Sequence, residues 1–149
     1  MSCRSELSLP VRYADTDAQG HVFFANYFTY ADEGLTACLA QLGCSYAWLE
    51  TVGIDLVYVS SSCQHRGSAR FGDVLTIYTT ITRIGRTSLT TTVEVCRGED
   101  VLAALALVSV CLDATTRRPC PAPEKLRAAC LAVESGDMVR REANLPDSA

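Results

Sequence analysis

Lysine and histidine are scarce in this sequence. Lys125 is the only lysine, and His21 and His65 are the only histidines. The eight cysteines form no C-x-x-C pair, so the three or four nitrogen and sulfur ligands of a zinc site are not in evidence, and we expect no metal. The positive charge is carried almost wholly by arginine, and its guanidinium group suits phosphate. The net charge of −4 argues against a nucleic-acid partner.

Several other signals are missing as well. No run of 18 apolar residues is present, so we expect no membrane span. The first ten residues, MSCRSELSLP, lack the apolar core of a signal peptide. We therefore expect a cytoplasmic protein with reduced thiols. The absence of a P-loop, of G-x-G-x-x-G and of G-x-S-x-G removes the common signatures of nucleotide-binding and serine-hydrolase folds.

The chain is long enough for one globular domain. It has 149 residues, of which 48% are hydrophobic, and a chain of this size buries about 70% of its unfolded surface. We expect a single domain over residues 1–133, followed by a polar C-terminal tail over residues 134–149.

The hydrophobic pattern predicts one long helix and a sheet. Apolar residues recur at three-to-four spacing over Asn26–Leu42, with Asn26 as the expected N-cap and Gly43 as the stop. Short β-branched or alternating segments predict the strands Glu6–Tyr13, Ile54–Cys63, Val74–Arg83, Ser88–Cys96 and Val101–Leu112, and a short helix follows at Glu124–Val133.

The order of these elements indicates an α+β fold. The last three strands are joined by hairpin-length turns and should form an antiparallel meander, with Val101–Leu112 either central or at a subunit contact. A curved antiparallel sheet wrapped around the long helix would bury the helix's apolar stripe. The edges of such a sheet can pair with a second copy, so we expect a homodimer at least.

The stretch Tyr13–Tyr27, YADTDAQGHVFFANY, contains the candidate chemistry. Asp15, Asp17 and Gly20 imitate the start of an EF-hand loop, but its twelfth position is Asn26 rather than the required glutamate. Calcium is therefore not expected. Cys63-Gln-His65 would place a thiol and an imidazole on one face of a strand, yet a polar strand end is the favoured interpretation.

Asp17 leaves two interpretations open. The first N–H groups of the helix can stabilise negative charge on a carbonyl oxygen. A carboxylate held beside them could attack that carbonyl or activate a water. Gly20 would let the loop turn tightly, and Phe23 and Phe24 would exclude water. The other interpretation is an Asx-turn that only precedes a helix.

These residues resemble the active-site signature of hotdog-fold acyl-CoA thioesterases of the 4-hydroxybenzoyl-CoA thioesterase type. The pattern is aspartate-x-aspartate-x-x-glycine-x-valine, followed shortly by asparagine–tyrosine. The resemblance runs from about Leu7 to Arg127 and includes ARFGDVLTI, TRIGRTSL and CPAPEKLR. It implies a hotdog fold, in which a curved sheet wraps around one central helix.

The resemblance also implies roles for individual residues. Asp17 matches the catalytic carboxylate, as nucleophile or general base, and the backbone N–H of Phe24 matches the donor to the thioester carbonyl. Many bacterial members carry histidine where Phe24 stands, and phenylalanine cannot transfer protons. His21 either assists the reaction or only holds the loop. Asp32 either orients water or substrate or satisfies a tyrosine.

The expected substrate is an acyl-CoA, hydrolysed to a free acid and coenzyme A without a metal or redox cofactor. The resemblance places phosphate contacts in the hairpin that contains Arg83, Arg86, Thr87 and Ser88, although an ordinary charged hairpin remains an alternative. The acyl pocket is expected from Phe23, Phe24, Tyr27 and parts of Ile54–Tyr58.

In the family the sites lie between subunits of a dimer or of a dimer of dimers, a homotetramer. Two further functions stay open. One is a non-catalytic acyl-CoA-binding sensor or carrier. The other is a hotdog hydratase that would pair His21 with Asp32.

Overall fold

A computed structural model describes residues 3–134 of the chain. The elements in chain order are β1 (Cys3–Pro10), the 3₁₀ turn η1 (Tyr13–Asp15), α1 (Asn26–Gln41), α2 (Tyr46–Thr51), β2 (Ile54–His65), β3 (Val74–Ile84), β4 (Ser88–Arg97), β5 (Asp100–Asp113) and α3 (Glu124–Glu134). The tail expected over 134–149 falls, beyond the last residue of α3, outside the described residues.

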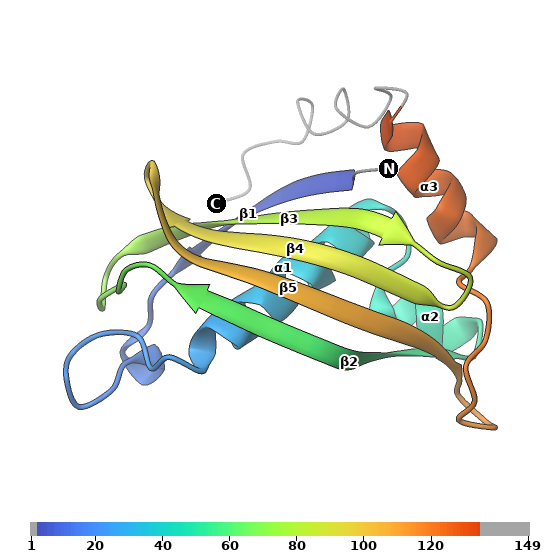
Figure 1. Ribbon diagram of the computed structural model, residues 1–149, viewed down its shortest axis with the longest axis horizontal. Coiled ribbons are helices and arrows are strands. Elements are labelled where there is room, and N and C mark those ends of the chain that lie inside the picture. Colours follow the sequence, from blue (N-terminus) through green and yellow to red (C-terminus); the bar gives the residue numbers. More distant parts are fainter. Residues whose placement is uncertain (1–2, 135–149) are drawn as a thin grey trace.

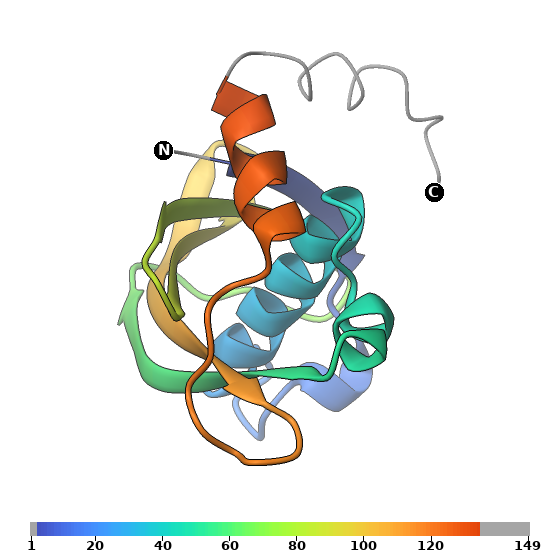
Figure 2. The ribbon, with the colours of Figure 1, turned by 90° about the vertical axis from the view of Figure 1, so that its right-hand side faces the viewer.

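The five strands form one antiparallel sheet in the order β1-β3-β4-β5-β2. The sheet curls around α1, which runs along its concave face (Figures 1 and 2). The expected meander of β3, β4 and β5 is confirmed. β5 is an internal strand, between β4 and β2, while β4 occupies the middle of the sheet.

The buried face of α1 is the predicted apolar stripe. Its members are Tyr27, Tyr30, Ala31, Gly34, Leu35, Cys38 and Leu39. They pack against inward-facing residues of the sheet, among them Ile77 and Ile81 of β3. At Gly34 the helix approaches β3 so closely that an added Cβ would lie 2.7 Å from Ile77 Cγ2. The stripe therefore fixes how α1 sits in the sheet, and with it the position of the helix N-terminus.

Two local predictions are wrong in detail, and one short helix was not predicted. The first strand ends at Pro10, and Tyr13 begins a 3₁₀ turn instead of ending the strand. Asn26 is the first residue of α1 and Ala25 occupies the N-cap; the Asn26 side chain donates a hydrogen bond to the Asp15 carbonyl instead. The helix α2, capped by the Ser45 hydroxyl, was not predicted. Gly43 does follow the end of α1 with a positive φ of 75°, as predicted.

β1 and β2 are the two edge strands of the sheet. β2 is 12 residues long, and most of its side chains are exposed, including Tyr58 and Val59 at a β-bulge. The edge strand thus offers unpaired backbone groups along one side of the molecule. None of the helices within residues 3–134 is long and apolar enough to cross a membrane.

Candidate active site

The loop before α1 is a small closed hairpin. Thr16 and Val22 form an isolated antiparallel bridge, and the Asp17 amide donates to the His21 carbonyl at 2.9 Å. The Gly20 amide donates back to the Asp17 carbonyl at 3.0 Å. Gly20 has a φ of 83°, in the left-handed region that favours glycine. This turn brings Asp17 and His21 side by side.

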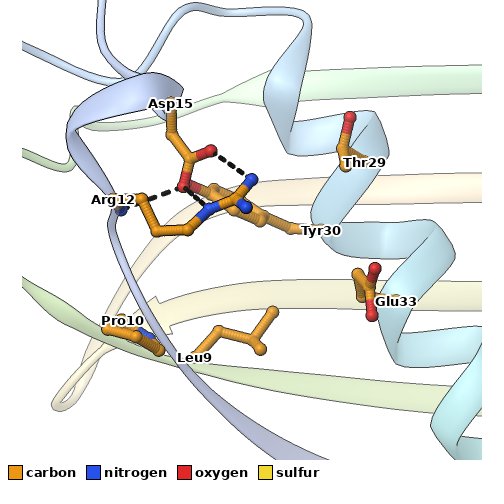
Figure 3. Close-up of a pocket in the computed structure, with 7 residues that line it drawn as sticks. All are labelled: Leu9, Pro10, Arg12, Asp15, Thr29, Tyr30 and Glu33. Carbon is orange, nitrogen blue, oxygen red and sulfur yellow. Dashed lines mark hydrogen bonds and ion pairs between the residues drawn. The ribbon is translucent and has the colours of Figure 1, made fainter.

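Asp15 anchors this loop to the rest of the protein. The residue is 5% exposed, and its carboxylate accepts hydrogen bonds from the Arg12 amide, the Arg12 guanidinium and the Tyr30 hydroxyl (Figure 3). Burial acts to raise the pKa of the Asp15 carboxyl, but the bonds from Arg12 and Tyr30 outweigh it and hold that pKa below its usual value. Asp15 is thus a structural anion whose carboxylate is already used in holding the loop.

Figure 3 shows the cavity beside this anchor. It has a volume of about 210 Å³ and lies between the end of β1 and α1, lined by Leu9, Pro10, Arg12, Asp15, Thr29, Tyr30 and Glu33. The Asp15 carboxylate in this cavity already accepts hydrogen bonds from three donor groups, and Asp17 does not line the cavity. The other acid of the loop, Asp17, therefore remains the candidate for chemistry.

Asp17 is held by two contacts and is partly open. Its Oδ1 accepts from the Gln19 amide at 2.9 Å, which is an Asx-turn. Its Oδ2 lies 3.3 Å from His21 Nδ1, and the side chain keeps 23% of its exposure. Asp17 also borders an open cavity of about 620 Å³, lined with it by Tyr13, Ala14, Thr16, Ala18, Gly20 and Phe71. The Asx-turn and the chemical interpretation are therefore compatible.

His21 faces two acceptors with the same nitrogen. Its Nδ1 lies 3.3 Å from the Asp17 carboxylate and 3.4 Å from the Val22 carbonyl oxygen. Because both neighbours only accept hydrogen bonds, we assign the proton to Nδ1. In this arrangement His21 orients the carboxylate of Asp17.

The start of α1 presents an uncommitted donor, the backbone N–H of Phe24, which has no acceptor among the described residues. The Phe23 amide donates to the Asp15 carbonyl at 2.9 Å, and the Asn26 side chain donates to the same oxygen. Within residues 3–134, no group accepts a hydrogen bond from the Phe24 amide. This N–H sits at the positive end of the helix dipole, where it can bind an oxygen that gains negative charge.

Several aromatic rings lie near the start of α1. Phe24 is 62% exposed, and its ring contacts that of Phe23, with centroids 4.9 Å apart. Tyr27 is buried, and its hydroxyl accepts from the Ala69 amide. The ring of His65, which the sequence interpretation assigned to a polar strand end, lies against both Phe24 and Tyr27. The sequence predicted this strand to end at Cys63, two residues before its actual end, and did not predict the packing of that end on α1.

Asp32 lies on the exposed side of α1 and contacts β2. The Tyr58 hydroxyl donates to Asp32 Oδ1 at 2.7 Å. Partial burial and this hydrogen bond raise the pKa of Tyr58 far above its usual value. Since His21 contacts Asp17 and Asp32 contacts Tyr58, the structure gives no support to the His21–Asp32 pair that a hydratase would use.

The hairpin between β3 and β4, residues 84–88, lies at the opposite end of the sheet from the Asp17 loop (Figure 1). The loop is tied to the start of β3, since the Val11 amide donates to the Asp73 carbonyl and the Val22 amide to that of Ala69. The 11 residues of β3 then span about 35 Å. One protomer therefore does not bring Asp17 close to Arg86, Thr87 and Ser88, or to Arg83 at the same end of β3.

That hairpin is nevertheless firmly held. The Ala122 amide donates to the Arg86 carbonyl, and the guanidinium of Arg127, from α3, donates to the carbonyls of Ile84 and Gly85. Among the described residues, no group of three or more histidine, cysteine or acidic side chains is arranged to hold a metal ion.

Known proteins are similar to this chain over most of its length. An acyl-CoA thioester hydrolase of Escherichia coli is 31% identical over 122 residues, which cover 80% of this chain and 91% of that protein. A 1,4-dihydroxy-2-naphthoyl-CoA hydrolase of Synechococcus elongatus is 27% identical over 119 residues, covering 78% and 88%.

A solved 1,4-dihydroxy-2-naphthoyl-CoA thioesterase from Synechocystis superposes with a TM-score of 0.81 at 25% identity, covering 88% of this chain and 98% of that one. The expected hotdog fold is thereby confirmed. The family model of the thioesterase superfamily matches residues 19–104, so the chain belongs to the thioesterase superfamily.

Proposed function

We propose that this protein is an acyl-CoA thioesterase, which hydrolyses an acyl- or aryl-CoA thioester to the free acid and coenzyme A. The observation that carries the proposal is the pairing of a partly open carboxylate, Asp17, with the uncommitted Phe24 amide in one short cross-linked segment. The relatives that act on acyl-CoA or aryl-CoA esters support the substrate class.

The chemistry follows from these two groups. The Phe24 N–H receives the thioester oxygen and stabilises it as the carbon becomes tetrahedral. Asp17 either attacks the carbonyl carbon itself or takes a proton from the water that attacks it. His21 keeps the carboxylate oriented, and the exposed rings of Phe23 and Phe24 shield the reacting centre from water. The reaction, as proposed, uses no metal ion or redox cofactor, and we place it in the cytoplasm.

A second copy of the chain is part of the proposal. A coenzyme A molecule with its acyl end at Asp17 would need the phosphate-binding hairpin near the same loop, yet in one protomer β3 separates them by about 35 Å. A homodimer, or a dimer of dimers, could place the Arg83–Ser88 hairpin of one protomer beside the Asp17 loop of the other. The exposed edge of β2 is the natural contact for such pairing.

The proposal predicts the effect of Asp17→Asn, which keeps the shape of the side chain and removes its charge. Thiol release from benzoyl-, phenylacetyl- and straight-chain acyl-CoAs should fall by about 10² to 10⁴-fold, as for loss of a general base. Glu50→Gln, an exposed carboxylate on α2, is the matched control and should keep full activity. Thermal unfolding of both variants should resemble that of the wild type.

The same assay separates the alternative function. If the wild type binds acyl-CoA but hydrolyses no ester above background, the protein is a sensor or carrier. If Asp17→Asn retains full activity, the assignment of the catalytic carboxylate is wrong. Full loss in Glu50→Gln would show that the assay reports general damage instead of chemistry at residue 17.

A further inference from the structure

The last residue of β2 reaches the first turn of α1. His65 pairs with Ala103 of β5 in the sheet register, and its ring points at the helix start. The ring centroids of His65 and Tyr27 are 5.4 Å apart, and those of His65 and Phe24 are 6.3 Å apart, both in edge-to-face arrangements. An exposed imidazole therefore lies beside the residue whose amide is the uncommitted donor.

One nitrogen of this imidazole is engaged and the other is available. His65 Nδ1 lies 3.9 Å from the Sγ of Cys63, two residues earlier and on the same face of β2. Tyr27, on which the ring rests, is fixed by the hydrogen bond from the Ala69 amide. The side chain of His65 is exposed, so Nε2 can meet a bound molecule.

The other histidine lies beside the Asp17 carboxylate instead. His21 Nδ1 is directed at the Asp17 carboxylate and the Val22 carbonyl, and these are the only two histidines in the chain. His65 also comes from β2, whereas Asp17 comes from the loop before α1. The carboxylate and the imidazole thus come from two different elements, the loop before α1 and the strand end that packs on its first turn, so one can serve the attacking group and the other the departing one.

Resting on the proposed thioesterase function, we propose that His65 is a further catalytic residue, which donates a proton from Nε2 to the departing thiolate of coenzyme A. As the tetrahedral intermediate collapses, the carbon–sulfur bond breaks and its electron pair goes to sulfur, which takes the Nε2 proton. The proton lost by the attacking water passes through solvent and reprotonates the imidazole. The net reaction is thioester plus water to acid plus thiol, whichever role Asp17 plays.

The test compares leaving groups of different acidity. His65→Phe keeps a flat ring against Phe24 and Tyr27 but cannot transfer a proton. Three esters of the acyl group that the wild type prefers are assayed: the coenzyme A ester, the N-acetylcysteamine ester, which shares its alkyl thiol, and the S-phenyl ester. A thiophenolate is a weak base that departs without a proton, so only the alkyl thioesters depend on a general acid.

We expect kcat/KM of His65→Phe to fall about 10²-fold for both alkyl thioesters and less than about threefold for the S-phenyl ester, as for loss of a general acid. His65→Phe should also retain the wild-type unfolding temperature.

Two results would overturn the role of His65. An equal loss on alkyl and phenyl esters would mean that the ring only shapes the site, and unchanged activity on all three would mean that it takes no part. Both differ from failure of the proposed function, in which the wild type itself hydrolyses none of the esters; the role of His65 would then fall with it.

Discussion

Asp15→Ala should destabilise the fold, because the carboxylate it removes accepts a hydrogen bond from a buried hydroxyl. The Tyr30 hydroxyl donates to Asp15 at 3.0 Å, and the Tyr30 side chain is buried. Leaving that hydroxyl unpaired costs about 2 kcal/mol, and losing the bond from the Arg12 amide at the start of η1 costs about 1 kcal/mol more. The Arg12 guanidinium is exposed and adds little.

The expected loss is thus about 3 kcal/mol in the free energy of unfolding at pH 7. It is measured by urea denaturation at one protomer concentration, since association would shift the midpoint. Asp17→Ala is the matched control. Its carboxylate is partly exposed, and among the described residues it bonds to the Gln19 amide and His21 alone, so its loss should cost less than about 1 kcal/mol.

The stability difference should also depend on pH. The folded protein holds the pKa of Asp15 below its ordinary value, so the carboxylate's contribution is fully present above the unfolded pKa of about 4. It is lost as pH falls through the lower folded-state pKa. The gap between wild type and Asp15→Ala should therefore narrow below about pH 4.

A double-mutant cycle with Tyr30→Phe isolates the buried contact. Because Asp15→Ala harms the fold mainly by stranding the Tyr30 hydroxyl, removing both partners should recover about 1–2 kcal/mol relative to the sum of the single changes. Strict additivity, or a gap between wild type and Asp15→Ala that stays constant down to pH 2, would refute the assignment of Asp15 as a buried anchor.

Two further changes test the packing that positions the site. Gly34→Ala should destabilise the fold by about 2 kcal/mol, although alanine has the better helix propensity, because the new Cβ would press on Ile77 and Thr79. Ala40→Gly, at an exposed position of the same helix, measures the propensity difference alone, which is about 1 kcal/mol. A Gly34→Ala variant more stable than the wild type would contradict the close approach of α1 to β3. Ser45→Ala should cost about 1 kcal/mol through loss of the cap on the Trp48 amide, whereas Ser45→Asp should retain most of the stability; equal urea midpoints for both would argue against the cap.

The parts of this fold that the sequence predicted are those with a strong local period. The α1 stripe from Tyr27 to Cys38 repeats every three to four residues, and the alternating burial of β3 and β4 repeats every two. Each pattern reflects one face packed against a partner. Hairpin-length turns then left little choice for the order of β3, β4 and β5.

The remaining features depend on contacts between residues far apart in the chain. Asparagine is a residue type that is common at N-caps, but the side-chain amide of Asn26 donates instead to the Asp15 carbonyl, 11 residues away. Helix α2 has six residues, too few for a periodic signal. Nothing local to Tyr58 or His65 indicates that one would reach Asp32 and the other Phe24; only the curl of the sheet brings β2 to α1.

In the proposed function the two acids of the loop have separate roles, since Asp15 supports the loop and Asp17 reacts. The Asp15 side chain ties η1 to Tyr30 of α1, while its carbonyl receives the Phe23 amide and the Asn26 side chain. These bonds fix the chain on both sides of Asp17 and at the residue before the Phe24 amide. A reacting carboxylate cannot also accept the buried bonds that Asp15 accepts, because each further donor hydrogen-bonded to its charged form would lower its basicity. Placing a second, buried acid two residues earlier resolves that conflict.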